Sequence, residues 1–425
     1  MASAIQPGGG QGVIVLGAGV IGLCTALYLR RAGRNVVVID PSPPAGGASF
    51  GNAGMISPDS SAPIAMPGML RQVPGWLLDR SGPLTVRPAY FVRALPWLLR
   101  WVRAGRLDRV MAISDALRAL HRPAFDCWRE LLGPEAFAAQ VHRTGQIQVW
   151  ETGQESATSA IDRRLQERAG VEMQTLTPDD LRQMLPGISP AIKRGRFLPN
   201  NGFTANPGKL VRTLGALFQQ EGGTILAERA LKLIPREGGG YVVMTNLANH
   251  SSCVVVVAMG AWSGRMLRPL GVRVPLEAER GYHAMLPDPS VMPRYTIGFK
   301  SRGFALTPME GGLRAAGTVE IAGLDAPPNE RRAQILIGHA KRLFPGLTHG
   351  APSLWMGLRP STPDSLPILG PAPSRPDLFL AFGHGHYGMT AGPASGRIVA
   401  QMIQRESLSA HHGRIDAAPY AASRF

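Results

Sequence analysis

The chain has 425 residues, a length that favours two domains, and its 44% hydrophobic and 17% charged residues are typical of a compact folded protein. The net charge is +16, but the arginines are scattered and form no zinc-finger or RNA-recognition pattern, so nucleic acid is not an expected partner. Three separated cysteines exclude a disulfide framework and a cysteine-rich zinc site.

The first twelve residues, MASAIQPGGGQG, lack the basic and apolar regions of a secretory signal. No apolar run reaches the ~18 residues of a membrane-spanning helix. The expected location is therefore the cytoplasm, with attachment to the inner face of the cytoplasmic membrane as an alternative.

A nucleotide-binding βαβ unit is predicted near the start of the chain. An apolar strand at 13–16 precedes the glycine pattern GAGVIG (17–22), and a helix is expected from Val20. These glycines permit a tight turn and close approach of backbone to a pyrophosphate, which the positive helix N-terminus attracts. A second strand, 36–39, ends in Asp40, whose carboxylate suits the ribose hydroxyls of an adenine dinucleotide.

The segment after this unit favours FAD over NAD. PPAGGASFGNAGMISP (43–58) is a second glycine-rich polar stretch where an NAD-binding domain usually continues to a helix and a third strand. A flavin domain needs a loop and helix start there, along the pyrophosphate and flavin ring. Ser49 and Asn52 are the expected polar contacts, and a plain surface loop is the alternative.

A basic segment with two tryptophans, Trp97 and Trp101, covers residues 89–110. At 100° per residue, Arg93, Arg100 and Arg103 share one face of the predicted helix, and the tryptophans lie on another. Two interpretations stay open: an interfacial helix on an anionic membrane, where a quinone could collect electrons, or a helix packed on the protein with a solvated basic face.

Later segments supply further elements of the same kind. Residues 206–228 have the pattern of an amphipathic helix followed by a strand, and 254–263 that of a buried strand ending in a glycine turn. Residues 303–320 fit two strands joined at Gly311 and Gly312. The stretch 378–404 is predicted as strand, glycine turn and helix.

Six ordered motifs make the chain resemble the FAD-dependent D-amino-acid oxidase and dehydrogenase superfamily, the DAO family. The motifs are GAGVIG…VID, GGASFGNAG, VVVVAMGAWS, ERGYHAML, GLRPSTPDSLPILG and FGHGHYGMT. SFGNAGMISP and the region near 60–110 are similar to bacterial D-amino-acid dehydrogenases. GHGHYGMT is similar to the subgroup acting on D-hydroxyproline and related cyclic D-amino acids. One departure is Asp40, where family members often carry glutamate.

The resemblance implies a mixed α/β fold with two domains. A split Rossmann-like FAD domain would comprise 10–57, 205–268 and 352–405, and a substrate domain on an antiparallel sheet would comprise 58–204 and 269–351, leaving a tail at 406–425. It also implies non-covalent FAD. The expected cofactor residues are Gly17, Ala18, Gly19, Val20, Ile21, Gly22, Asp40, Pro41, Gly47, Ser49, Asn52, Ala53, Gly54, Met55, Ala258, Gly260, Trp262, Arg359, Gly383, Gly385, His386, Gly388, Met389 and Thr390.

Arg359 matches the family arginine that binds the substrate carboxylate, and a guanidinium can hold a carboxylate through two hydrogen bonds. A structural ion pair with Asp364 is the alternative. Tyr282 is expected to line the pocket and offer its hydroxyl to the substrate, or else to be a core aromatic with a satisfied hydroxyl. The further pocket candidates are His283, Thr307 and Tyr387.

His384 and His386 have three interpretations. A metal site is disfavoured because flavin dehydrogenation uses no metal and no further ligands accompany the pair. His386 could accept the proton of the substrate ammonium. The favoured interpretation is a strand-to-helix turn whose backbone N–H groups, with the Thr390 hydroxyl, face the flavin pyrimidine edge.

The expected activity is hydride transfer from the α-carbon of a D-amino acid to FAD, with electrons passed to a quinone or another non-oxygen acceptor. Cyclic D-amino acids such as D-hydroxyproline or D-proline are the expected preference. The alternatives are an oxidase that reduces O2, a non-catalytic flavin-binding subunit of a larger complex, and an NAD-only dehydrogenase.

Overall fold

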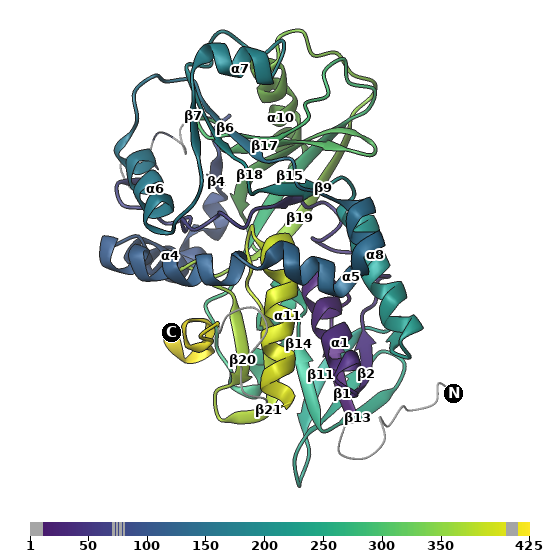
Figure 1. The fold of residues 1–425 in the computed structure, drawn as a ribbon. Helices are drawn as coiled ribbons and strands as arrows, with labels where there is room; N and C mark the ends of the chain where they lie inside the picture. Colours follow the sequence, from purple (N-terminus) through teal and green to yellow (C-terminus); the bar gives the residue numbers. More distant parts are fainter. Residues whose placement is uncertain (1–11, 70–72, 74, 76–78, 80, 405–414) are drawn as a thin grey trace.

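The computed structural model describes residues 12–69, 73, 75, 79, 81–404 and 415–425 (Figure 1). Two large sheets with helices on their faces dominate this part of the chain, in agreement with the predicted mixed α/β class. Strands that lie far apart in the sequence meet in each sheet, so the chain passes between the two sheets several times.

The lower sheet in Figure 1 holds the nucleotide-binding unit, and five of its six described strands are parallel. In spatial order they are β10 (Thr224–Leu226), β2 (Asn35–Ile39), β1 (Gly12–Leu16), β14 (Val254–Val257), β21 (Arg375–Phe382) and β20 (Ile368–Ala372), the last antiparallel. The strands predicted at 13–16, 36–39 and 254–257 are confirmed. All of β1 is buried, as expected for a central parallel strand.

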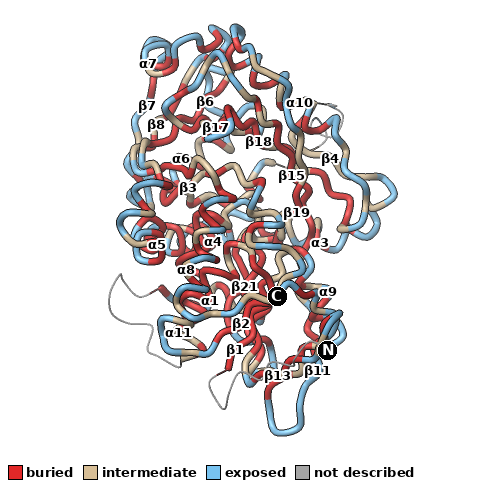
Figure 2. The backbone as a smooth tube through the Cα atoms, turned by 90° about the vertical axis from the view of Figure 1, so that its right-hand side faces the viewer, coloured by how far each residue is buried: buried red, intermediate tan, exposed pale blue. Residues whose placement is uncertain are grey.

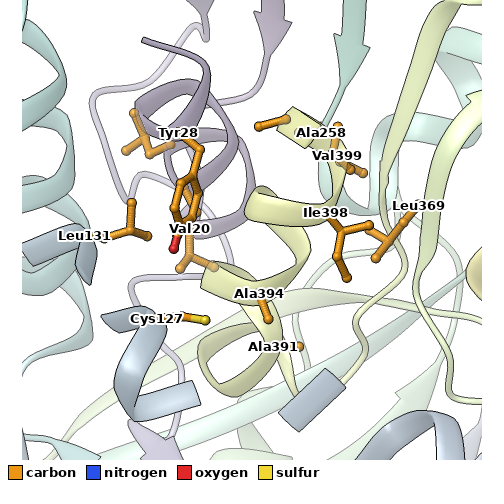
Figure 3. Close-up of a cluster of buried hydrophobic side chains, with 14 of the residues drawn as sticks. Val20, Tyr28, Cys127, Leu131, Ala258, Leu369, Ala391, Ala394, Ile398 and Val399 are labelled. Atoms are coloured by element: carbon orange, nitrogen blue, oxygen red, sulfur yellow. The ribbon is translucent and has the colours of Figure 1, made fainter. Parts of the chain in front are cut away.

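Three helices cover one face of this sheet: α1 (Val20–Arg31), α8 (Pro207–Gln220) and α11 (Gly388–Gln404). Figure 3 shows Val20 and Tyr28 of α1 packed against Ala391, Ala394 and Ile398 of α11. Gly396 allows this close packing, because a Cβ there would lie 2.7 Å from the backbone nitrogen of Thr25. The starts of α1 and α11 are therefore held side by side.

The upper sheet is larger and mainly antiparallel (Figure 1). Its described strands, in order, are β19 (Ser353–Ser361), β15 (Glu277–Leu286), β18 (Gly312–Ile321), β17 (Phe304–Met309), β16 (Thr296–Phe299), β6 (Gln146–Trp150), β8 (Arg194–Leu198) and β7 (Gln174–Leu176), with β4 (Leu84–Val86) beside β18. The pair predicted over 303–320 is confirmed by β17 and β18, but the turn lies at Glu310 and Gly311, and Gly312 is already the first residue of β18. Helix α10 (Glu330–Leu343) packs on the face turned away from the nucleotide-binding sheet.

Smaller elements complete the described fold. They are β3 (Met55–Ile56), β5 (Val141–His142) and β9 (Gly202–Thr204), the meander β11 (Ala230–Pro235), β12 (Tyr241–Thr245) and β13 (Asn249–Ser252), and helices α3 (Phe91–Ala104), α4 (Leu107–His121), α5 (Ala124–Gln140), α6 (Ala157–Arg168), α7 (Pro178–Met184) and α9 (Ser263–Leu267). Figure 2 shows buried backbone concentrated in the two sheets and the helices against them.

The predicted domain ranges stay a prediction. The segment 352–405 gives β19 to the upper sheet and β20, β21 and α11 to the lower one. The predicted tail at 406–425 falls partly outside the described residues, but its last part packs on the body: Tyr420 is buried and Arg424 pairs with Asp364 at 2.8 Å.

Helix α3 corrects part of the membrane hypothesis. Trp97 is buried and its Nε1 donates to the Ser361 carbonyl oxygen at 3.2 Å, while Trp101 is half-buried, so the tryptophans face the protein. The apolar side chains that α3 exposes are Phe91, Val92, Leu95 and Leu99. Within the described ranges, no helix is both long and apolar enough to cross a bilayer.

Candidate active site

A cavity of about 1360 Å³ runs from the nucleotide-binding unit to the inner face of the upper sheet. Drug-sized ligands usually occupy about 300–1,000 Å³, so this cavity has room for a dinucleotide and a second molecule. Of the predicted site residues, those that line it are Gly17, Gly19, Val20, Ile21, Asp40, Pro41, Gly47, Ser49, Asn52, Ala53, Met55, Ala258, Gly260, Trp262, Tyr282, Arg359, Gly385, His386, Tyr387, Gly388, Met389 and Thr390. Those that do not line it are Ala18, Gly22, Gly54, His283, Thr307 and Gly383.

The end of the cavity at α1 fits a dinucleotide pyrophosphate. Gly17 has φ +111°, a conformation that favours glycine, and a Cβ on Gly22 would overlap the Gly17 carbonyl oxygen. Gly22 therefore acts through packing, outside the cavity. Asp40 accepts a hydrogen bond from the Ala18 backbone nitrogen at 2.8 Å, which fixes its carboxylate at the carboxyl edge of β2. This glycine cradle before a helix N-terminus suits the phosphates of FAD.

The 43–58 segment borders the same end, as predicted, but as turns without a helix start. Ser49 Oγ accepts from the Val20 backbone nitrogen at 3.0 Å, so the segment is tied to the first turn of α1. Asn52 Oδ1 accepts from the Gly54 nitrogen at 2.8 Å. Arg314, which sequence reasoning did not select, donates to the carbonyl oxygen of Asn52 at 2.6 Å and holds the segment against β18.

The FGHGHYGMT stretch forms the predicted strand, glycine turn and helix, with α11 starting at Gly388. Gly385 in the turn has φ +50°. Thr390 lines the cavity, and its hydroxyl accepts from the Ser57 nitrogen at 3.0 Å; that this hydroxyl faces the flavin stays a prediction. His384 is buried against Ser395, with its Nε2 2.9 Å from Ser395 Oγ, and burial lowers its pKa to about 3. His384 also lines the cavity, where it presents a neutral imidazole.

Arg359 is half-buried at the cavity wall. Its Nη1 donates to the Thr318 carbonyl oxygen at 3.0 Å, and a Cβ on Gly281 would overlap its guanidinium. Gly281 therefore leaves the space in which the arginine head lies. The alternative pairing with Asp364 is wrong, because Asp364 pairs with Arg424. The arginine is thus left to bind an anionic group in the cavity.

Glu279 and His386 form a pair that the sequence did not reveal. His386 Nε2 lies 3.0 Å from Glu279 Oε2, and Glu279 is directly opposite Arg359 in the pairing of β15 with β19. Burial opposes ionisation of Glu279, but the hydrogen bond and charge of His386, with the charge of Arg359, outweigh it and lower the pKa of the carboxyl. A carboxylate, an imidazole and a guanidinium therefore share one part of the cavity wall.

Tyr282, His283 and Thr307 were predicted to bind the substrate, and of these three Tyr282 lines the cavity while the other two do not. The Tyr282 hydroxyl donates to Glu320 at 2.5 Å and accepts from the Asn329 nitrogen at 3.1 Å, so it is a core aromatic with a satisfied hydroxyl. His283 is buried, stacks on Trp355 and has Nδ1 3.0 Å from the Gly51 carbonyl oxygen. Thr307 is buried away from the cavity. Successive side chains of a strand point to opposite faces of the sheet. The Tyr282 ring points to the face of β15 that α10 covers, which explains why its hydroxyl has partners there.

Tyr387, the remaining pocket candidate, lines the cavity, and its hydroxyl donates to the Ala62 carbonyl oxygen at 3.2 Å. This leaves its ring, packed on His121, as the part available to a ligand. No cluster of three or more His, Cys, Asp or Glu side chains arranged to hold a metal ion occurs among the described residues.

Comparison with known proteins agrees with this geometry. The family model described as "FAD dependent oxidoreductase" (DAO) matches residues 12–402. The chain is 36% identical over 423 residues to a D-amino-acid oxidase of Bradyrhizobium diazoefficiens, covering 98% of this chain and 99% of the relative. It is 31% identical over 401 residues to a D-amino acid dehydrogenase of Vibrio vulnificus, covering 92% and 96%.

Among solved structures, glycine oxidase from Geobacillus kaustophilus superposes with a TM-score of 0.72 at 23% identity, covering 97% of this chain and 98% of that one. This likeness concerns the fold. Together with the family match over almost the whole chain, it shows that the protein belongs to the DAO family of FAD-dependent oxidoreductases.

Proposed function

We propose that this enzyme oxidises D-amino acids at the α-carbon. The observation that carries the proposal is the half-buried Arg359 guanidinium on the same cavity wall as the Glu279–His386 pair. A zwitterionic amino acid has a carboxylate that matches the guanidinium and an ammonium that matches the carboxylate–imidazole pair. The names of the relatives with 36% and 31% identity support the D configuration.

Each residue has a defined task in this proposal. Arg359 binds the substrate carboxylate and thereby fixes the orientation of the α-carbon. His386 accepts a proton from the substrate ammonium, and Glu279 orients the imidazole and stabilises its charged form. The residues of the cavity would hold FAD, which would supply the acceptor for the hydride of the α-carbon. The resulting imino acid reacts with water to give a 2-oxo acid and ammonia, or remains a cyclic imine when the substrate is cyclic.

The electron acceptor belongs to the same proposal. The predicted similarity of SFGNAGMISP to bacterial dehydrogenases supports a quinone or another non-oxygen acceptor. The first relative above is named an oxidase, and O2 is therefore the competing acceptor. A membrane acceptor is supported by α3, where exposed Phe91, Val92, Leu95 and Leu99 lie beside Arg93, Arg100 and Arg103.

An anaerobic titration tests the proposal. Bleaching of the flavin absorbance by D-alanine but not by L-alanine is expected, and D-proline and D-hydroxyproline test the predicted cyclic preference. Absence of bleaching by any D-amino acid would favour the non-catalytic alternative. Admitting air to the reduced enzyme then separates the acceptors: slow reoxidation in air, with fast reoxidation by a soluble quinone, supports a dehydrogenase.

A further inference from the structure

The cavity extends beyond Arg359 across the upper sheet, over a floor of small residues. Ala316 of β18 is paired with Ala305 of β17, Ala305 with Gly298 of β16, and Gly298 with Gln148 of β6. All four residues line the cavity. Three neighbouring small side chains in register leave a groove along this floor, and Gln148 stands at its far end.

The far end of the groove is polar and contains an unsatisfied acceptor. Gln148 is 6% exposed, and its Oε1 is buried without a hydrogen-bond partner. A buried amide oxygen without a partner is destabilising, so its position indicates a missing donor. Asp162 and Gln166 of α6 also line this end, and both accept from Arg196 Nη1, which lies behind them outside the cavity wall. The end wall therefore presents oxygen acceptors to whatever enters the groove.

The two ends of the groove are separated by a distance that suits a long side chain. The Arg359 guanidinium lies over β15 and β18, since Nη1 reaches the Thr318 carbonyl oxygen. Three strand spacings of about 4.8 Å place β6 roughly 14 Å from β18. The side chain of Gln148 reaches back over part of this distance. A substrate of lysine or arginine length would cover the remainder, whereas alanine or proline would leave Gln148 unpaired.

We infer that this groove is a side-chain subsite for linear D-amino acids that end in a hydrogen-bond donor, such as an ammonium, a guanidinium or an amide. The inference rests on the proposed function, because Arg359 must hold the α-carboxylate for the side chain to lie along Ala316, Ala305 and Gly298. Gln148 Oε1 accepts from the terminal donor, and Asp162, which pairs with Arg196, lies at the same end of the groove. Substrate choice is then decided by a residue on β6, remote from the reacting carbon.

The test compares D-lysine with D-norleucine, which carries a methyl group in place of the aminomethyl end of lysine. The FAD-loaded wild-type enzyme should have a kcat/KM for D-lysine at least about tenfold above that for D-norleucine. A factor of this size is what one buried hydrogen bond to a charged group contributes. Gln148→Leu should reduce this ratio to near one, mainly through D-lysine. Gln148→Glu retains a hydrogen-bond acceptor, so it should keep or raise the ratio of the two kcat/KM values. This second variant tests the subsite even if the leucine variant does not fold.

Gly298→Val examines the groove itself. The Cβ of a residue at 298 would lie 3.7 Å from the nearest atom, an ordinary contact, so the variant should fold while narrowing the groove. It should lower kcat/KM for both D-lysine and D-norleucine relative to D-alanine. Gln183→Leu, the same change as Gln148→Leu on the exposed surface of α7, is the matched control and should leave every ratio unchanged.

The outcomes separate the two proposals. If no D-amino acid bleaches the flavin, the proposed function fails and the subsite fails with it. If D-alanine or D-proline bleaches the flavin but D-lysine and D-norleucine have equal kcat/KM, only the subsite is overturned. An unchanged ratio in a folded Gln148→Leu enzyme overturns it as well.

Discussion

His386 Nε2 lies 3.0 Å from the Glu279 carboxylate, which joins the turn before α11 to β15, the strand beside the β19 edge of the upper sheet. The imidazole remains 32% exposed and lines the cavity, whereas Glu279 is buried. The carboxylate can therefore stabilise a proton on His386 without meeting solvent itself. This arrangement gives the proposed proton acceptor a fixed orientation.

His386→Gln should lower kcat/KM at pH 7 by about 100-fold with FAD still bound, because general-base assistance is worth about that much. The loss should shrink as the pH rises, since more of the substrate then carries a free amine. Glu279→Gln should have a similar effect, and the double variant should be scarcely worse than either single one. Stopped-flow flavin reduction between pH 6 and pH 10 measures this. Additive losses that persist at high pH would show that the two residues act separately.

Gly281→Ala should impair substrate binding through Arg359. The new Cβ overlaps the position of the guanidinium, so the arginine must move from the Thr318 carbonyl oxygen. Misplacing a charged hydrogen-bond donor costs roughly 1.5–3 kcal/mol, and kcat/KM should fall about 10- to 100-fold.

Gly338→Ala is the control for this change. Gly338 lies on the exposed side of α10 with open space around it, and alanine there should leave kinetics unchanged and stability equal or slightly higher. Substrate titrations of the flavin spectrum give the affinities. If Gly281→Ala binds D-alanine like the wild type, the space beside Gly281 does not position Arg359.

Local sequence carried enough information to predict the elements around the cofactor. The first βαβ unit, the β17–β18 pair and the turn into α11 each depend on neighbouring residues, such as the glycines from Gly17 to Gly22 and from Gly383 to Gly388. The place of Arg359 at the cavity was predicted from the GLRPSTPD motif that contains it. These features need no knowledge of how distant strands pair.

The Glu279–His386 pair and the groove could not be predicted in the same way. Glu279 and His386 are 107 residues apart, and the floor of Ala316, Ala305 and Gly298 exists only through the register of three strands. The partner of the Tyr282 hydroxyl, Glu320, could not be predicted because the sequence does not show to which face of β15 the ring points. Strand pairing and facing depend on tertiary contacts that no single motif carries.

Three buried histidines should make the enzyme sensitive to acid. Burial lowers the pKa of His121 and His283 to about 4 and that of His384 to about 3. The unfolded chain protonates these groups near pH 6.5 while the native protein does not, so stability should fall as the pH drops from about 6.5 towards 4. Each histidine contributes up to about 1.4 kcal/mol per pH unit.

Urea unfolding at saturating FAD, at pH 7.5, 6.5 and 5.5, measures this dependence. The free energy of unfolding should change little between pH 7.5 and 6.5 and then decline. Replacing His384 by Asn should make the decline shallower, since one fewer group takes up a proton on unfolding. A stability that stays constant or rises between pH 6.5 and 5.5 would contradict the burial of these neutral imidazoles.

The exposed face of α3 should bind anionic membranes. Leu95 and Leu99 lie one turn apart and are 39% and 57% exposed, and the neighbouring Arg93, Arg100 and Arg103 are exposed as well. The wild-type enzyme should sediment with vesicles rich in anionic lipid at low salt and should be released as salt screens the arginines. Leu95→Glu combined with Leu99→Glu should reduce sedimentation, because it places negative charge on the apolar contact.

Leu247→Glu, at a side chain that is 60% exposed between β12 and β13, is the matched control and should sediment like the wild type. No sedimentation at low salt, or an equal loss in the control, would remove the basis for a membrane acceptor, and a soluble electron carrier would then be the acceptor to test.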